Sequence, residues 1–225
     1  MEEPESLKVV LLGESGVGKT SIISQFTTSN FNPRVQTSVS AQFVSKTLDF
    51  PEFGKTIKFD IWDTVGQEKY RSLAKIFYKD AKVIIFVYDV TSLTSMNALR
   101  EFWHKETLNN ADNDPLFAVV ANKIDLYSNL QVKNEEGKAF ADEINAIFQP
   151  TSALNSSGID KLFVNIGKKI LKPDYDYQES DKKAQENFKQ KQNEDYKKEK
   201  KTRIQIDSNS IKEEKKNGNK KKKCC

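Results

Sequence analysis

The sequence near the N-terminus reads Gly13-Glu14-Ser15-Gly16-Val17-Gly18-Lys19-Thr20, directly after the largely apolar run Leu7 to Leu12. The apolar run predicts a strand, and the residues from Ser21 onward predict a helix. A strand, then G-x-x-x-x-G-K-[ST], then a helix is the context of a phosphate-binding loop. Glycines carry no Cβ, so backbone N–H groups can approach phosphate oxygens, and the helix N-terminus adds positive potential. In such a loop Lys19 neutralises phosphates and Thr20 binds Mg²⁺. An ordinary Gly-rich turn is the alternative.

The charge of the chain is distributed unevenly along its 225 residues. Residues 1–171 hold 19 Lys and Arg against 21 Asp and Glu, whereas residues 172–225 hold 17 against 11. The basic segment also has few apolar side chains, so it cannot offset the entropy lost on ordering. We therefore expect a short disordered N-terminus at 1–6, a folded domain at 7–171 and a disordered tail at 172–225.

Several classes of protein are disfavoured by the composition. No apolar run approaches the ~18 residues that a membrane span needs. The acidic start, Met1 to Glu5, does not fit a signal peptide, and Glu2 stands where myristoylation would need glycine. The only cysteines, Cys224 and Cys225, are adjacent, which argues against a disulfide framework. We expect a cytosolic chain.

The pattern of apolar residues after the loop predicts an α/β fold. Residues 42–48 and 56–62 alternate as in the strands of a hairpin, whereas residues 83–88 and 116–121 are nearly continuous apolar runs, typical of buried parallel strands. Pro150 places a last strand at a sheet edge. Helical patterns separate these strands, so we predict a mostly parallel six-stranded sheet with one antiparallel edge strand and helices on both faces.

A second motif, Asn122-Lys123-Ile124-Asp125, follows one of the buried strands. A carboxylate such as Asp125 can accept hydrogen bonds from guanine N1–H and the 2-amino group, whereas adenine presents an acceptor at N1. An unpaired carboxylate would therefore reject ATP. The motif predicts a guanine site. A plain turn at the strand end, or a P-loop ATPase or kinase, are the alternatives.

Five segments occur in the order and spacing of a guanine-nucleotide switch: residues 13–20, 37–43, 63–67, 122–125 and 151–153. Residues 7–171 therefore resemble Ras-superfamily small GTPases. Residues 62–64, 66–73, 77–78 and 87–91 are most similar to Rab proteins, with the endosomal branch nearest. The resemblance implies a P-loop NTPase small G domain that binds GTP or GDP with Mg²⁺ and hydrolyses GTP slowly. It also implies a role in vesicle transport.

The resemblance implies a set of nucleotide-binding residues. In this sequence they are Gly13, Glu14, Ser15, Gly16, Val17, Gly18, Lys19, Thr20, Ser21, Phe31, Ser38, Gly66, Asn122, Lys123, Asp125, Leu126, Ser152, Ala153 and Leu154. The metal ligands implied are Thr20, Ser38 and Asp63, with Thr37 as the competing candidate for Ser38. Phe31 matches an aromatic residue that packs on the guanine edge, although it could be an ordinary core anchor. Leu154 replaces a lysine that is frequent in the family.

The segment Asp63-Thr64-Val65-Gly66-Gln67 resembles the second switch of the family. The resemblance implies that the Gly66 N–H senses the γ-phosphate and that Gln67 is catalytic, orienting the attacking water without a protein nucleophile. Val65 stands where the family normally has alanine, and its branched side chain would lie beside the γ-phosphate. We expect weak intrinsic hydrolysis. A nearly hydrolysis-deficient, GTP-locked membrane adaptor is the alternative.

Two further features resemble Rab proteins. Phe43, Trp62 and Phe77 match an aromatic triad that effectors contact, although they could merely pack. The C-terminal Cys224-Cys225, after four lysines, resembles a double geranylgeranylation site. Two lipid chains and a basic patch hold a membrane stably. A solvated basic tail or a nucleic-acid arm is the alternative.

The resemblance also implies partners and a location. The partners are an exchange factor, an activating protein, a GDP-dissociation inhibitor, effectors, and a Rab escort protein with geranylgeranyltransferase. The location is the cytoplasmic face of endosomal or vesicular membranes, in exchange with the cytosol. We expect a monomeric G domain and no nucleic-acid partner.

Overall fold

A computed structural model of the chain describes residues 4–31, 42–64, 77–111 and 114–178. The chain divides into two units, Met1–Tyr175 and Asp176–Cys225, and the fold below is that of the first. Several predicted functional residues lie outside the described residues: Thr37, Ser38, Val65, Gly66, Gln67, Cys224 and Cys225.

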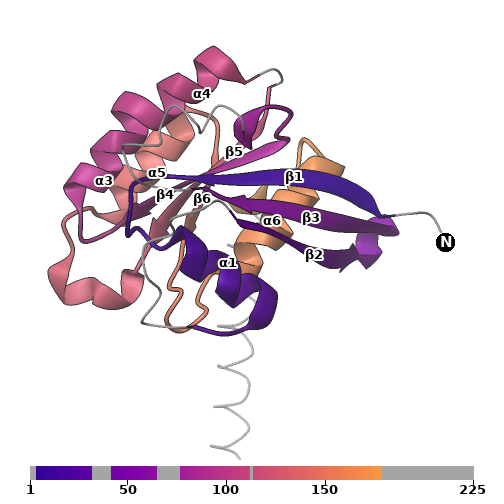
Figure 1. Cartoon of the computed structure of the whole chain (residues 1–225), viewed down its shortest axis with the longest axis horizontal. Helices are drawn as coiled ribbons and strands as arrows, with labels where there is room; N and C mark the ends of the chain where they lie inside the picture. The colour runs from indigo at the N-terminus through magenta and orange to yellow at the C-terminus, as the bar shows by residue number, and fades with distance from the viewer. Residues whose placement is uncertain (1–3, 32–41, 65–76, 112–113, 179–225) are drawn as a thin grey trace, which may run out of the picture. The chain divides into compact units, whose positions relative to one another are not determined.

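Within the described ranges, six strands form one sheet in the order β2-β3-β1-β4-β5-β6 (Figure 1). Their bounds are β1 Glu5–Leu12, β2 Gln42–Phe50, β3 Lys55–Asp63, β4 Val83–Asp89, β5 Leu116–Asn122 and β6 Ile147–Pro150. Only β2 runs antiparallel to its neighbour, β3, and it lies at one edge. The other pairs are parallel. The predicted sheet is confirmed, including the position of Pro150 in the strand at the other edge.

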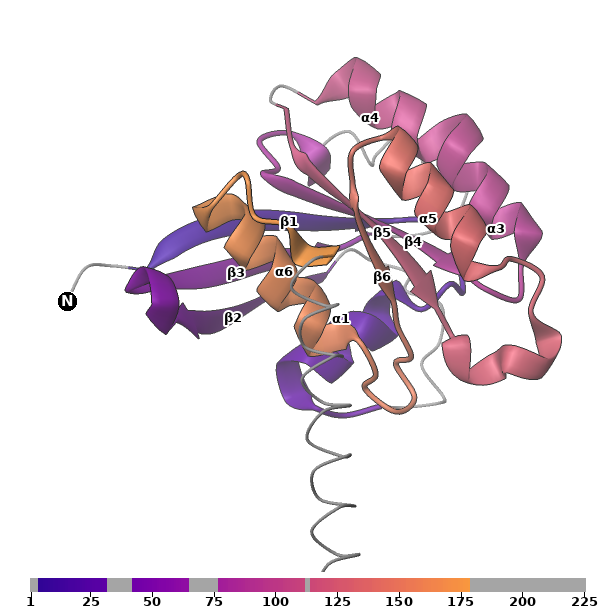
Figure 2. The ribbon, with the colours of Figure 1, turned by 180° about the vertical axis from the view of Figure 1, so that it is seen from behind.

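Helices cover both faces of this sheet, as Figures 1 and 2 show. On one face lie α1 (Lys19–Thr28) and α6 (Ile159–Leu171). On the other lie α5 (Asn134–Glu143) and a long helix composed of α3 (Leu93–Ala98), a π-helical turn (Leu99–Trp103) and α4 (His104–Asn110). Short 3₁₀ segments span Pro51–Phe53 and Ile124–Asn129. The predicted α/β architecture is confirmed.

Aromatic rings join α1 and α6 to the sheet. Phe26 of α1 stacks on Phe163 of α6 with ring centroids 3.6 Å apart. Phe59 of β3 meets both rings edge-on, at 6.2 Å and 5.7 Å. All three side chains are buried, and such aromatic contacts add about 0.5–1.5 kcal/mol to the effect of burial. The cluster fixes α1, and with it the loop that precedes α1.

The long helix departs from its predicted packing in its last turn. Met96, Leu99 and Trp103 are buried, as their spacing predicts. Leu108 continues the roughly helical spacing of apolar residues in this segment of the sequence, but it is 60% exposed. Thr107, four residues after Trp103, takes the buried position, where its hydroxyl donates to the Trp103 carbonyl at 2.8 Å.

Within the residues that the structure describes, no helix has the length and apolar character to cross a bilayer.

Candidate nucleotide-binding site

The glycine-rich loop between β1 and α1 has backbone conformations that need glycine. Gly13 has φ of 148° and Gly18 has φ of 99°. A Cβ at Gly13 would collide with the Val87 carbonyl oxygen, and one at Gly18 would collide with the Asn122 side-chain amide. Both glycines therefore satisfy a steric and a conformational requirement. They allow the loop to lie directly against the ends of β4 and β5.

Lys19 begins α1 and is only 5% exposed. Its ammonium donates to the carbonyl oxygens of Gly13 at 2.8 Å and Glu14 at 3.0 Å. Burial lowers the pKa of Lys19 to about 8, although the negative charges of Asp63 and Glu14 oppose the change. A cation that burial disfavours gains stability when an anion binds beside it. The loop is therefore suited to hold a negatively charged group.

Thr20 and Asp63 lie together behind this loop. The Thr20 hydroxyl donates to an Asp63 carboxylate oxygen at 2.5 Å, and Asp63 is 2% exposed at the end of β3. The next residue, Thr64, donates its hydroxyl to the Leu11 carbonyl at 2.6 Å and so fixes this segment to β1. Mg²⁺ prefers oxygen ligands and commonly takes one or two from the protein beside waters and phosphates. The oxygens of Thr20 and Asp63 fit that requirement.

Asn122 joins three parts of the chain at the end of β5. Its buried amide nitrogen donates to the Val17 carbonyl at 2.8 Å, and its amide oxygen accepts from the Thr151 hydroxyl at 3.1 Å. The side chain thus connects β5 to the glycine-rich loop and to the segment after β6. It holds the two predicted motifs at a fixed separation.

Asp89, which is not among the site residues predicted from the sequence, orients Lys123. Lys123 has a left-handed backbone with φ of 67°, and its ammonium lies 2.6 Å from one Asp89 carboxylate oxygen. The other oxygen accepts from the Thr91 N–H at 2.8 Å and the Thr91 hydroxyl at 2.7 Å. Asp89 pairs in register with Asn122. Adjacent parallel strands end at the same edge of the sheet, where ligands bind. The position of Asp89 at the end of β4 was therefore a sequence signal that it lies near Asn122 and Lys123.

Asp125 also has a side-chain partner that the motif alone does not reveal. The Ser152 hydroxyl donates to one Asp125 carboxylate oxygen, and Ser152 is wholly buried. Ser152 is among the residues predicted from the sequence to bind the nucleotide, but its contact with Asp125 was not predicted. The hydrogen bond fixes the Asp125 carboxylate at the loop after β6.

A hollow of about 270 Å³ connects the glycine-rich loop to the Asp125 segment. It is lined by Gly16, Gly18, Ser21, Phe31, Asn122, Lys123, Asp125, Leu126, Ala153 and Leu154. Each of these residues is among those predicted from the sequence to contact a nucleotide. A larger hollow of about 560 Å³ near Leu7, Leu116 and Ile170 contains none of them.

The three aromatic residues predicted as an effector surface form one cluster. Phe43 of β2 and Trp62 of β3 are register partners, with ring centroids 5.1 Å apart. The Phe77 ring lies 6.0 Å from Trp62. Phe43 is 51% exposed, whereas Trp62 and Phe77 are partly buried. The cluster is continuous and reaches the surface at its Phe43 end.

The fold and the hollow define a P-loop nucleotide-binding domain. A family model described as the Ras family matches residues 8–172. The Ras-related protein RabJ of Dictyostelium discoideum is 39% identical over 164 residues, which cover 73% of this chain and 63% of RabJ. The human Ras-related protein Rab-22A is 38% identical over 168 residues, 75% of this chain and 85% of the relative. The chain belongs to the Ras family, within its Rab branch.

The family membership establishes the general activity. Ras and Rab proteins are GTPases that bind GTP or GDP with Mg²⁺. This chain is a Rab-like small GTPase of membrane trafficking. Their partners are exchange factors, activating proteins, GDP-dissociation inhibitors and effectors. The resemblance inferred from the sequence is thereby confirmed at the level of the family.

Proposed function

We propose that the hollow between the glycine-rich loop and Asp125 holds the guanine nucleotide of a Rab-type switch. The observation that supports this most strongly is that two motifs more than a hundred residues apart line one hollow of about 270 Å³. The phosphates lie along Gly13–Thr20, and the base lies between Phe31 and the segment of Asp125 and Ala153. The domain that carries the site is residues 7–171.

At the phosphate end the backbone N–H groups and Lys19 compensate the negative charge. Lys19 is already held at the loop by two carbonyl oxygens, so little reorganisation is needed when phosphate arrives. Thr20 and Asp63, together with Ser38 as the family resemblance implies, would hold Mg²⁺, which would neutralise charge at the phosphate oxygens. The family resemblance assigns sensing of the γ-phosphate to Gly66 and orientation of the attacking water to Gln67.

At the base end Asp125 selects guanine. Its carboxylate accepts from the base N–H groups, and its bond from Ser152 keeps it in place. Asn122 and Lys123 support the same pocket through their contacts with Val17 and Asp89. Adenine would leave the carboxylate without donors, which is costly in a partly closed site.

Loss of the γ-phosphate then changes the effector surface. The family uses the two switch segments as the elements that respond to the γ-phosphate. The cluster of Phe43, Trp62 and Phe77 adjoins these segments in the sequence, and its exposed end suits contact with an effector. We therefore assign effector binding to this cluster.

The tail, residues 172–225, attaches the domain to a membrane. Rab escort protein and geranylgeranyltransferase would modify Cys224 and Cys225, and the adjacent lysines would bind anionic lipid. The resemblance to the endosomal branch favours the cytoplasmic face of endosomes or vesicles. Mass spectrometry of the C-terminal peptide from native cells tests this, and unmodified cysteines would refute it.

A GTP-locked adaptor is the second candidate, because Val65 replaces the usual alanine in the second switch. We expect slow hydrolysis that a Val65→Ala variant accelerates. Single-turnover hydrolysis of GTP by both proteins is the test. Measurable turnover by the wild type supports a switch, and turnover in the Val65→Ala variant alone supports the adaptor. Equal rates would show that Val65 has no effect.

A further inference from the structure

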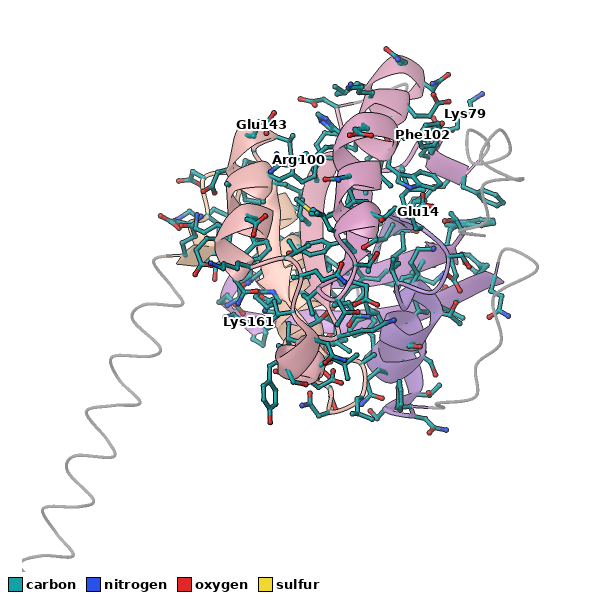
Figure 3. All side chains as sticks on the ribbon, turned by 90° about the vertical axis from the view of Figure 1, so that its left-hand side faces the viewer. Glu14, Lys79, Arg100, Phe102, Glu143 and Lys161 are labelled. Atoms are coloured by element: carbon teal, nitrogen blue, oxygen red, sulfur yellow. The ribbon has the colours of Figure 1, made fainter. Side chains whose placement is uncertain are left out.

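A hydrogen bond joins the glycine-rich loop to the long helix of α3, the π turn and α4. This helix lies on the face of the sheet opposite α1 (Figures 1 and 2). The indole N–H of Trp103 donates to a carboxylate oxygen of Glu14 at 3.0 Å. Trp103 is fully buried, whereas Glu14 is half-buried in the loop. Figure 3 shows Glu14 beside this helix. A buried indole N–H needs an acceptor, and a charged acceptor gives the stronger bond.

The long helix changes from α-helical to π-helical hydrogen bonding in the turn that ends at Trp103. Leu99–Trp103 form a π-helical turn, in which the His104 N–H donates to the carbonyl of Leu99, five residues earlier. The turns on either side, α3 and α4, are α-helical. Single π turns are rare and occur frequently at functional sites. Here the turn ends at the residue that contacts the loop, so it sets the direction in which Trp103 points.

Glu14 is held at both its side chain and its backbone. While its carboxylate accepts from Trp103, its carbonyl oxygen accepts from the Lys19 ammonium at 3.0 Å. Any rotation of the Glu14 peptide would move that carbonyl away from Lys19. The three residues therefore form a continuous sequence of contacts from the buried helix to the cation at the phosphate end.

We propose that Trp103 is a positioning residue for nucleotide binding: it holds Glu14 so that the Glu14 carbonyl keeps the Lys19 ammonium in place for the phosphates. This inference rests on the proposed function of the glycine-rich loop. Trp103 contacts the loop at the Glu14 side chain, so it acts through Glu14. Its loss increases the rate at which bound nucleotide leaves.

The experiment measures release of a fluorescent GDP analogue from the full-length protein after addition of excess GDP. Four variants are compared with the wild type: Trp103→Phe, Glu14→Ala, Glu14→Gln, and Trp103→Phe combined with Glu14→Ala. We expect Trp103→Phe and Glu14→Ala each to accelerate release about tenfold, as for a lost hydrogen bond to a charged group. Glu14→Gln keeps an acceptor oxygen but loses the charge, so its release rate should lie between those of the wild type and Glu14→Ala. The double variant should release no faster than Glu14→Ala.

Phe102→Leu is the matched control, because Phe102 belongs to the same π turn and meets the Trp103 ring edge-on at 5.1 Å. It should release the analogue within about twofold of the wild type, since it leaves the Glu14 bond in place. Equal acceleration by Phe102→Leu, or multiplication of the two single effects in the double variant, would overturn the inference. If Trp103→Phe does not fold, the comparison of Glu14→Ala with Glu14→Gln decides, and equal release rates would overturn it.

This test distinguishes failure of the positioning role of Trp103 from failure of the proposed nucleotide site. A wild-type protein that does not bind the analogue would overturn the proposed phosphate site and the inference together. A wild type that binds it, with variants that release it at the wild-type rate, overturns the inference alone.

Discussion

The two ends of the proposed nucleotide site are built differently. At the phosphate end the groups are mostly main chain, and Lys19 is held by the carbonyl oxygens of Gly13 and Glu14. At the base end the groups are side chains, each held by another side chain: Lys123 by Asp89 and Asp125 by Ser152.

This difference separates affinity from selectivity. Backbone groups and one lysine can bind the phosphates of any nucleotide, because every nucleotide carries them. Side chains with fixed donors and acceptors can distinguish one base from another. Changes at the phosphate end should therefore weaken all nucleotides alike, whereas changes at the base end should alter the preference among them.

Lys19→Ala should have the largest effect. Loss of the cation should weaken GDP, GTP and ATP binding alike by about 2–5 kcal/mol, or roughly thirtyfold or more. Because burial lowers the pKa of Lys19, its charge is costly in the empty protein, so the variant should not lower the free energy of unfolding without nucleotide. Titration calorimetry and urea unfolding of the nucleotide-free protein measure both quantities. Selective loss of GTP binding would contradict the conclusion that the phosphate end binds all nucleotides alike.

Asp125→Ala should abolish selectivity while preserving much of the phosphate contribution. Inosine triphosphate lacks the 2-amino group of guanine, so the wild type should prefer GTP to ITP by about tenfold or more. In the variant that ratio should approach one, because the acceptor for the 2-amino group is gone. Competition of the two nucleotides against a bound fluorescent GDP analogue gives the ratio. An unchanged ratio would show that Asp125 does not read the base.

Asp89→Asn should have a smaller effect, since it disturbs the base end through Lys123. We expect guanine nucleotides to bind about three- to tenfold more weakly, as for one weakened charged hydrogen bond. Asp142→Asn is the control, because Asp142 pairs with Lys138 at 2.6 Å, the same distance, on the exposed face of α5. That variant should bind like the wild type. Equal losses in the two variants would contradict a specific role for Asp89.

His104 provides the smallest effect, remote from both ends. It packs against the rings of Phe86, Phe117 and Phe140, and this burial lowers its pKa, although Glu143 opposes the change. A lowered pKa means that the unfolded chain binds the proton more readily, so stability should fall as pH drops below about 6.5. His104→Gln should lose less stability across that range. Urea unfolding of the GDP-bound proteins at pH 7 and pH 5.5 tests this, with parallel loss in both proteins as the contrary result.

Local patterns were sufficient to predict the sheet and the positions of the motifs. The strand, loop and helix around Gly13–Thr20 are contiguous in the sequence, and buried strands such as β4 appear as apolar runs. Pro150 predicted an edge strand because it cannot donate a backbone hydrogen bond. These features depend on neighbouring residues, so the sequence displays them directly.

The supporting contacts were not predictable in the same way. Asp89 meets Lys123, Ser152 meets Asp125, and Trp103 meets Glu14 only after distant segments pack together. These three contacts depend on three-dimensional neighbours rather than on local composition. Thr107 rather than Leu108 is buried for a local reason: it lies four residues after Trp103, on the same side of the helix, and its hydroxyl donates to the Trp103 carbonyl.

In the proposed site one hollow binds phosphates at one end and selects guanine at the other. The most direct measurement is displacement of a fluorescent GDP analogue from the full-length protein by GTP and by ATP in the presence of Mg²⁺. We expect GTP to displace it at concentrations about 10³-fold lower than ATP, or lower still. Displacement at equal concentrations, or no binding of the analogue, would contradict it.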